Sequence, residues 1–278
     1  MSHFLNIEMM RISPDMSKTS ARRGQSKVLY IIPGTEMEGE EIERRKRVLN
    51  SMASPNFSVD VSICKTGPPS IESYFDEYMS VPDTLRFAVR GEKEDYNALI
   101  IGCYGDPGLD AAREVVSIPV VGPGESSMLL ACSLGDQFSI LTVTDSVKKS
   151  MKKYAQRMGI SERLASVRAI GIPVTEIGKR AKDAKHALAE EAKKAIREDG
   201  ADVLILGCMS EGFLGVAEEM TREMKIPVLN PVSVSLKTAE LLISCGLAHS
   251  RLAYLLPPKL QKVTSKSNFL SALESQKL

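Results

Sequence analysis

The sequence predicts an α/β fold of two pseudo-symmetric domains, each a mostly four-stranded parallel sheet flanked by helices, with a cleft between them. Short apolar runs alternate with amphipathic segments along most of the 278 residues. The runs are continuous in Val, Ile and Leu, which is typical of strands buried on both faces of a parallel sheet. The same succession of runs also occurs twice, which indicates an internal repeat.

Eight apolar runs are predicted to be strands. The first set comprises residues 27–34, 57–64, 97–103 and 118–122, and the second comprises 138–144, 165–172, 202–208 and 226–230. Amphipathic patterns predict helices at 39–52, 146–159 and 184–200, the last ending at Gly200 as helices often do. Alternation of this kind implies right-handed crossovers between parallel strands.

The two sets of strands are in register. Cys103 in "GCYGD" and Cys208 in "GCMSE" each follow a strand directly. The segment "SIPVVGPGESSM" (117–128) likewise corresponds to "KIPVLNPVSVSL" (225–236). The chain after each of these segments could cross to the opposite half. We therefore predict a first domain of residues 27–123 completed by 231–256, and a second domain of residues 124–230. A flexible extension (1–26) and a tail (257–278) complete the prediction.

Composition excludes several classes of protein. Hydrophobic residues make up 43% and charged residues 26% of the chain, as in soluble globular proteins. A net charge of +1 indicates neither a nucleic-acid partner nor an anionic membrane surface. Five widely spaced cysteines without a secretion signal favour reduced thiols in the cytoplasm. With three histidines and no C-x-x-C pair, we expect no metal site.

Cys103 and Cys208 are the leading candidates for chemistry. Both follow strands, and in open parallel sheets ligands bind beyond the carboxyl ends of the strands. A nearby helix N-terminus is expected to lower the thiol pKa and favour the thiolate. A planar carbanion held between two such sulfurs could lose a proton to one and gain a proton from the other. For the remaining cysteines, Cys64, Cys132 and Cys245, ordinary packing is the better interpretation.

Two carboxylates lie three residues after these cysteines. Asp106 is predicted mainly as the N-cap of a helix that begins at Pro107, with catalytic acid as the alternative. Glu211 occupies the matching position after Cys208, and Ser210 beside it is the better candidate for a cap. Both carboxylates are expected near the thiols without contacting substrate directly.

These residues resemble the aspartate/glutamate racemase superfamily, and its hydantoin-racemase-like branch in particular. The most specific part is "GCYGDPGLDAAREVVSIPVVGPGESSM", supported by "GPPSIESYFDEY" (67–78) and "LGCMSEGFLGVAEEM" (206–220). The resemblance covers the chain from Lys27 to about Pro257. It implies an active site in the cleft, where paired cysteines act as acid and base without metal, pyridoxal phosphate or other cofactor. In this sequence the pair is Cys103 and Cys208.

The loops around the cysteines are expected to bind substrate, and two of them depart from the family pattern. The first has "IPGTEME" where many relatives have Asn-Pro-Asn-Thr, and the second has Met-Ser-Glu after Cys208 instead of a Cys-Ala-Gly-like loop. For Glu125 and Ser233, helix capping is the alternative to substrate binding. The predicted substrate-binding residues are Pro33, Thr35, Tyr104, Gly105, Glu125, Ser126, Met209, Ser210 and Ser233.

The resemblance implies a cofactor-independent racemase or epimerase that acts on a carbon acid next to a carbonyl. A 5-substituted hydantoin suits the sequence better than free aspartate or glutamate, because the ring carbonyls acidify the C–H bond. Two alternatives stay open: a non-catalytic small-molecule-binding or accessory protein, and a single-cysteine decarboxylase or cis–trans isomerase. We expect a small-molecule substrate, no nucleic acid, no membrane and, because relatives often assemble, a homo-oligomer.

Overall fold

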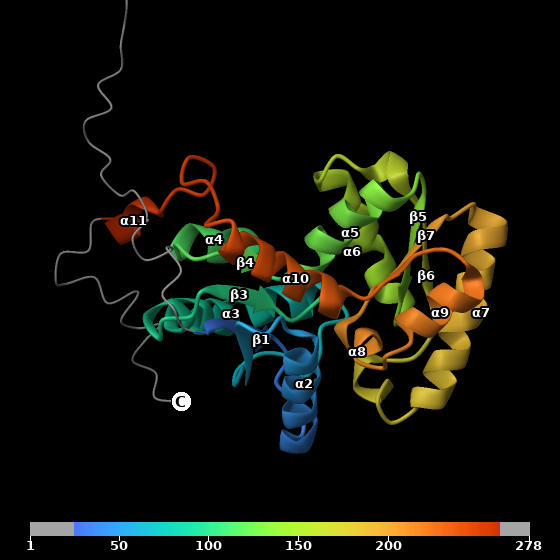
Figure 1. The fold of residues 1–278 in the computed structure, drawn as a ribbon, viewed down its shortest axis with the longest axis horizontal. Helices are drawn as coiled ribbons and strands as arrows, with labels where there is room; N and C mark the ends of the chain where they lie inside the picture. The colour runs from blue at the N-terminus through green and yellow to red at the C-terminus, as the bar shows by residue number, and fades with distance from the viewer. Residues whose placement is uncertain (1–24, 262–278) are drawn as a thin grey trace, which may run out of the picture.

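The structure is a computed structural model that describes residues 25–261 (Figure 1). The predicted extension and tail fall almost entirely outside these residues. Two four-stranded sheets, parallel at every pairing, form the centres of two α/β units. The first sheet has the order β2-β1-β3-β4 and the second has the equivalent order β6-β5-β7-β8. The predicted fold class and its pseudo-symmetry are confirmed.

The strands begin and end close to the predicted runs. In the first sheet they are β1 (Ser26–Ile32), β2 (Phe57–Ile63), β3 (Ala98–Ile101) and β4 (Val120–Val121). In the second they are β5 (Phe138–Thr142), β6 (Leu164–Ala169), β7 (Val203–Leu206) and β8 (Val228–Leu229).

Helices connect consecutive strands and cover the sheets. Those associated with the first unit by sequence are α2 (Gly39–Met52), α3 (Tyr74–Lys93), α4 (Leu109–Val115) and α5 (Pro123–Leu134). The second unit contributes α6 (Lys148–Arg157), α7 (Ala181–Asp199), α8 (Met209–Gly212), α9 (Ala217–Met224) and α10 (Pro231–Ser244), and α11 (Pro258–Gln261) follows. Single 3-10 turns lie at η1 (Asp145–Val147), η2 (Ser161–Arg163) and η3 (Val174–Glu176). Gly200 ends α7 in the left-handed conformation, with φ of 75°, as predicted.

The central strand β1 shows why these runs are apolar throughout. Val28 and Tyr30 pack into the core beneath α2 and α10, whereas Leu29 and Ile31 pack into the core beneath α3 and α4. All four side chains are at most 3% exposed. Because helices cover both faces of the sheet, neither set of alternating side chains meets solvent.

Two helices cross between the units (Figure 1). After β4, α5 packs on the second sheet, where Met128 and Ala131 join the core around Ile140. After β8, α10 packs on the first sheet, where Val232 and Leu236 join the other core. The two helices also contact each other. On these contacts we propose the interleaved division predicted from the repeat, with 231–256 completing 27–123.

Candidate active site

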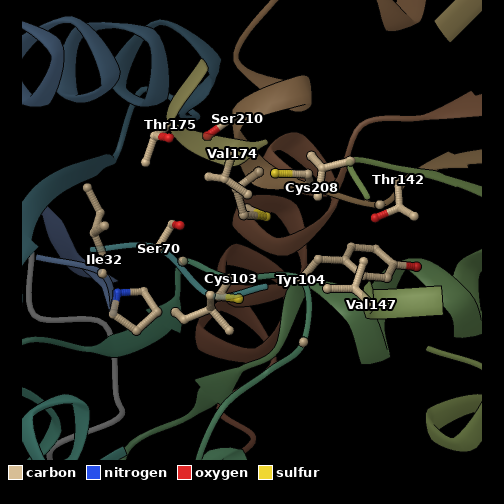
Figure 2. A pocket seen from close by; sticks show the side chains of 18 of the residues that line it. Ile32, Ser70, Cys103, Tyr104, Thr142, Val147, Val174, Thr175, Cys208 and Ser210 are labelled. Atoms are coloured by element: carbon tan, nitrogen blue, oxygen red, sulfur yellow. The ribbon is translucent and has the colours of Figure 1, made fainter. Parts of the chain in front are cut away.

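A cavity of about 1180 Å³ lies at the carboxyl ends of the strands, lined by segments of both units. Cys103 follows β3 and Cys208 follows β7, and both line this cavity. Figure 2 shows the two side chains with hydroxyl-bearing and aliphatic neighbours from both units. The structure therefore brings together the two cysteines that the repeat singled out.

The glycine before each cysteine allows the chain to pass directly over the central strand of its own sheet. A Cβ atom on Gly102 would lie 2.4 Å from Cε1 of Tyr30, and one on Gly207 would lie 2.6 Å from Cγ2 of Ile140. The N–H of Gly102 donates to the carbonyl of Ile31 at 2.6 Å, and that of Gly207 makes the equivalent bond to Leu141. The Gly-Cys pair thus has the same local geometry in both halves of the chain.

Burial raises the pKa of both thiols. For Cys103 this effect exceeds the opposing effect of the Gly105 N–H, and a charge on Cys208 raises the pKa of Cys103 further. For Cys208, burial and the charge of Glu211 raise the pKa, while the N–H groups of Ser210 and Glu211 and the Arg45 guanidinium lower it. The expectation that helix N-termini would lower the thiol pKa is wrong in net direction. The reason is that α4 starts only at Leu109 and α8 is a single turn, so desolvation prevails.

Asp106 caps a different helix from the one predicted. Its carboxylate accepts hydrogen bonds from the N–H groups of Gly124 (3.0 Å) and Glu125 (2.8 Å) in the first turn of α5. The Tyr154 hydroxyl donates to it at 2.5 Å. Asp106 itself has φ of 52°, and α4 is preceded by Gly108 instead. Burial raises the pKa of Asp106 to about 7. The predicted cap of the helix after Pro107 is therefore wrong, because the side chain points across to the crossing helix.

Ser210 is not a cap either. Its Oγ accepts a hydrogen bond from Nη2 of Arg45 at 2.9 Å, and the N-cap position of α8 is Cys208. Arg45 is 6% exposed and also donates to Glu41, at 2.8 Å. Its guanidinium lies 4.7 Å from the ring centroid of Phe213. A buried cation from α2 thus reaches the loop of Cys208. The sequence did not predict Arg45 as a site residue, because the segment that forms α2 showed only an amphipathic pattern.

Of the eleven residues predicted to be catalytic or to bind substrate, seven line the cavity and four do not. The seven are Pro33, Cys103, Tyr104, Gly105, Cys208, Met209 and Ser210. The other four are Thr35, Glu125, Ser126 and Ser233.

Local hydrogen bonds explain why these four residues are elsewhere. The Thr35 hydroxyl donates to the carbonyl of Pro68 at 3.1 Å, and the Ser126 and Ser233 hydroxyls donate to carbonyls at the start of their own helices. The Glu125 carboxylate forms a 2.6 Å ion pair with Arg113 of α4. These four side chains are bound to backbone carbonyls or to Arg113, and their predicted contact with substrate stays a prediction.

Other residues that line the cavity were not predicted. Thr142 is the last residue of β5 and lines the cavity. Ligands bind beyond the carboxyl ends of parallel strands, so this rule would have predicted Thr142 as it predicted the two cysteines. Ser70 lies in the segment 67–78, which had been noted only as a motif. Val174 and Thr175 belong to η3, where no local signal indicates a site. The Glu72 carboxylate accepts the Val174 N–H at 2.7 Å and so joins the two units beside the cavity.

In the described part of the chain, no group of three or more His, Cys, Asp or Glu side chains is placed to hold a metal ion. No helix within residues 25–261 combines the length and the hydrophobicity needed to cross a bilayer.

Comparison with known proteins gives a consistent result. The profile of the family described as Asp/Glu/Hydantoin racemase matches residues 42–239. A hydantoin racemase from Pseudomonas sp. (strain NS671) is 37% identical over 211 residues, which cover 76% of this chain and 82% of that protein. The allantoin racemase structure from Klebsiella pneumoniae is 28% identical with a TM-score of 0.80, covering 90% of this chain and 99% of that one. The allantoin racemase from Pseudomonas fluorescens is also 28% identical, with a TM-score of 0.74 and coverage of 84% and 97%.

Proposed function

The chain belongs to the Asp/Glu/hydantoin racemase family and is an isomerase of the racemase type, and we propose that it inverts a carbon next to a carbonyl in a hydantoin-like ring by a two-cysteine mechanism without a cofactor. The observation that carries this proposal is the placement of Cys103 and Cys208, one from each repeat, on the wall of a single cavity. A non-catalytic role would not require a thiol at both positions.

The proposed reaction conserves protons between the two sulfurs. One cysteine starts as thiolate and removes the proton from the ring carbon, and the electron pair moves into the adjacent carbonyl as an enolate. The other cysteine, still a thiol, gives its proton to the opposite face of that carbon. The two sulfurs thereby exchange protonation states. Because a charge on Cys208 raises the pKa of Cys103, the pair favours a single negative charge.

A hydantoin-like ring suits the surroundings of the thiols. The side chains of Ser70, Thr142 and Thr175 line the cavity and offer neutral hydrogen-bonding groups (Figure 2). The relatives are named for hydantoin and for allantoin, and allantoin is itself a 5-ureidohydantoin. We therefore propose 5-substituted hydantoins, allantoin included, as the substrate class.

Residues of the loops at the cavity are our candidates for substrate binding. We propose that Tyr104, Gly105, Met209 and Ser210 shape the substrate site from the two cysteine loops, and Pro33 from the first loop. The five unpaired cysteines support our proposal of a cytoplasmic, reducing location.

The decisive experiment measures exchange and inversion separately. Hydantoins and free amino acids are incubated with the protein in deuterium oxide, and NMR and chiral chromatography follow the α-proton and the configuration. We expect exchange and inversion of hydantoins. Cys103→Ser and Cys208→Ser should each abolish inversion, because a serine hydroxyl is a far weaker acid than a thiol. Each variant should still exchange deuterium into one enantiomer, and the two variants should differ in which one.

Cys132→Ser is the matched control, because Cys132 is a free cysteine that does not line the cavity. It should racemise at the parental rate. If Cys103→Ser or Cys208→Ser also racemises at the parental rate, the two-base mechanism is wrong. If the parent exchanges no hydantoin but does exchange amino acids, the substrate class is wrong.

A further inference from the structure

The residue that follows each cysteine is buried in the core of the opposite unit. Tyr104, which follows Cys103, is 2% exposed and packs in the core of the second sheet with Ile140. Met209, which follows Cys208, is 3% exposed and packs in the core of the first sheet. Protein interiors are close-packed, so a side chain buried in this way cannot shift independently of its surroundings. Each cysteine loop therefore takes its position from the unit to which it does not belong.

One hydrogen bond on each side adds to this exchange between the units. From α2 of the first unit, Nη2 of Arg45 donates to Oγ of Ser210 at 2.9 Å, in the loop after β7. From α6 of the second unit, the Tyr154 hydroxyl donates to the Asp106 carboxylate at 2.5 Å, in the loop after β3. Both donors are buried and line the cavity. Each cysteine loop is thus bound by one side chain that reaches it from the opposite unit.

The two donors hold equivalent positions in the repeat. The helices α2 and α6 each follow the first strand of their unit, and Arg45 and Tyr154 are each the seventh residue of their helix. The Arg45 guanidinium is also fixed by a 2.8 Å hydrogen bond to Glu41 and by the Phe213 ring, whose centroid lies 4.7 Å away. The pseudo-symmetry therefore extends to these two contacts, but one donor is a cation and the other is a neutral hydroxyl.

We propose that Arg45 and Tyr154 are positioning residues, each of which holds the cysteine loop of the opposite unit, so that Arg45 controls the half-reaction at Cys208 and Tyr154 controls the one at Cys103. The inference rests on the proposed function in assigning one face of the substrate to each sulfur. Proton transfer requires each sulfur close to the reacting carbon, and a displacement of about 1 Å can cost about a hundredfold in rate. Neither positioning residue gains or loses a proton, so the exchange of protons between the sulfurs is unaltered.

The unequal charge of the two donors makes the two halves unequal. Burial raises the pKa of both thiols, and the charge of Glu211 adds to this effect at Cys208. The Arg45 guanidinium opposes it at Cys208, whereas the charge of Asp106 raises the pKa of Cys103 further. Loss of Arg45 should therefore slow the half-reaction at Cys208 through charge as well as through position.

Single-cysteine variants separate the two half-reactions. Cys103→Ser leaves only Cys208 to exchange the α-proton of a hydantoin in deuterium oxide, and Cys208→Ser leaves only Cys103. Arg45→Met keeps the bulk of the side chain and removes the hydrogen bond. It should slow exchange about tenfold or more in the Cys103→Ser protein and about twofold or less in the Cys208→Ser protein. Tyr154→Phe should show the reverse, whereas a residue that only stabilises the fold would slow both by the same factor.

Arg47→Met and Tyr96→Phe are the matched controls. Arg47 is an exposed arginine on α2, and the Tyr96 hydroxyl donates to the Asp60 carboxylate at 3.0 Å. Neither residue lines the cavity, so neither substitution should change exchange in either single-cysteine protein. Where Arg45→Met does not fold, Ser210→Ala breaks the same hydrogen bond from the other side and should show the same selectivity for Cys208.

The proposal is overturned if Arg45→Met and Tyr154→Phe slow both single-cysteine proteins by the same factor. It is also overturned if either substitution leaves exchange at its assigned cysteine unchanged. If the single-cysteine proteins exchange no hydantoin, iodoacetamide labelling of both cysteines in the same protein decides the question. Arg45→Met should then change the labelling rate of Cys208 and not that of Cys103, and Tyr154→Phe should do the reverse. Equal changes at both cysteines would refute the assignment.

The proposed function and the positioning roles fail separately. If the parent racemises no hydantoin, the proposed function is wrong. The labelling experiment needs no turnover, so it still decides whether each cysteine loop is held by the residue assigned to it.

Discussion

At the scale of single residues, the site is defined by what surrounds each sulfur. Burial alone would keep both thiols protonated, and the opposing groups are few: the N–H of Gly105 for Cys103, and Arg45 with two N–H groups for Cys208. A racemase of this type needs only one thiolate at a time. The environment that resists ionisation therefore also prevents the inactive state in which both sulfurs are charged.

The order of cysteine labelling follows from this environment. Cys245 is exposed, so iodoacetamide at neutral pH should modify it first. Labelling of Cys103 and Cys208 should be slow at neutral pH and should rise as the pH increases, because burial raises the pKa of both thiols. Cys64 is 1% exposed and, unlike Cys103 and Cys208, does not line the cavity, so it should react last. Peptide mapping by mass spectrometry at several pH values checks the order.

Substrate protection provides the control for this labelling. A hydantoin at saturating concentration should slow the modification of Cys103 and Cys208 and leave that of Cys245 unchanged. Fast labelling of both cavity cysteines at pH 7 would show that the thiolate is more favoured than the buried surroundings allow.

At the scale of elements, the ends of the helices organise the cavity. The start of α5 is held by hydrogen bonds to the Asp106 carboxylate and by the Arg113–Glu125 ion pair. The Tyr254 hydroxyl accepts a hydrogen bond from Arg113 at 3.1 Å, so the segment after α10 supports the same helix end. A residue in the loop of Cys103 thus fixes a helix that covers the opposite sheet. The cysteine loop and the crossing helix are positioned together.

Asp106→Ala tests this arrangement. It removes the cap of α5 and leaves the buried Tyr154 hydroxyl without its partner. We expect a loss of about 1–3 kcal/mol in the free energy of unfolding, typical of a lost cap together with an unpaired buried group. Urea denaturation at pH 8 measures it. Asp110→Ala is the control: this exposed residue lies in the first turn of α4, and its loss should change stability by about 0.5 kcal/mol or less. Equal effects of the two substitutions would refute the cap.

At the scale of the whole molecule, the two units complete each other. The core of the first sheet contains Val232, Leu236 and Ala239 from α10, and the core of the second contains Met128 and Ala131 from α5. Since each unit buries a helix that follows the last strand of the other, neither core is complete in a contiguous half of the chain. The loops of Cys103 and Cys208, one from each unit, line the same cavity.

Unfolding should therefore be a single cooperative transition. Separation of either unit would expose the apolar face of α5 or α10, which couples the two cores. Differential scanning calorimetry should give one peak, with equal calorimetric and van't Hoff enthalpies. A fragment that ends near residue 135 should neither fold nor racemise hydantoins. Two separate transitions, or a folded fragment, would contradict the shared cores.

Local patterns in the sequence were sufficient for the elements, the repeat and the cysteine pair. Strand positions follow from apolar runs, and Cys103 and Cys208 stand out because the Gly-Cys step recurs after equivalent strands. These features depend on residues that are neighbours along the chain. Five residues beside those strand ends line the cavity, and their predicted binding of substrate stays a prediction: Pro33, Tyr104, Gly105, Met209 and Ser210.

Only the tertiary structure decided what each polar group contacts and whether it is charged. Asp106 was assigned to its own helix and caps α5, and Arg45 reaches the loop of Cys208 from a helix that had shown only an amphipathic pattern. The thiol pKa values were predicted to be lowered and are raised instead. The reason is that the burial of a thiol depends on side chains from segments that are distant in sequence. Sequence periodicity records which face of an element is buried, whereas the pKa of a group and its hydrogen-bond partners depend on what packs against that face.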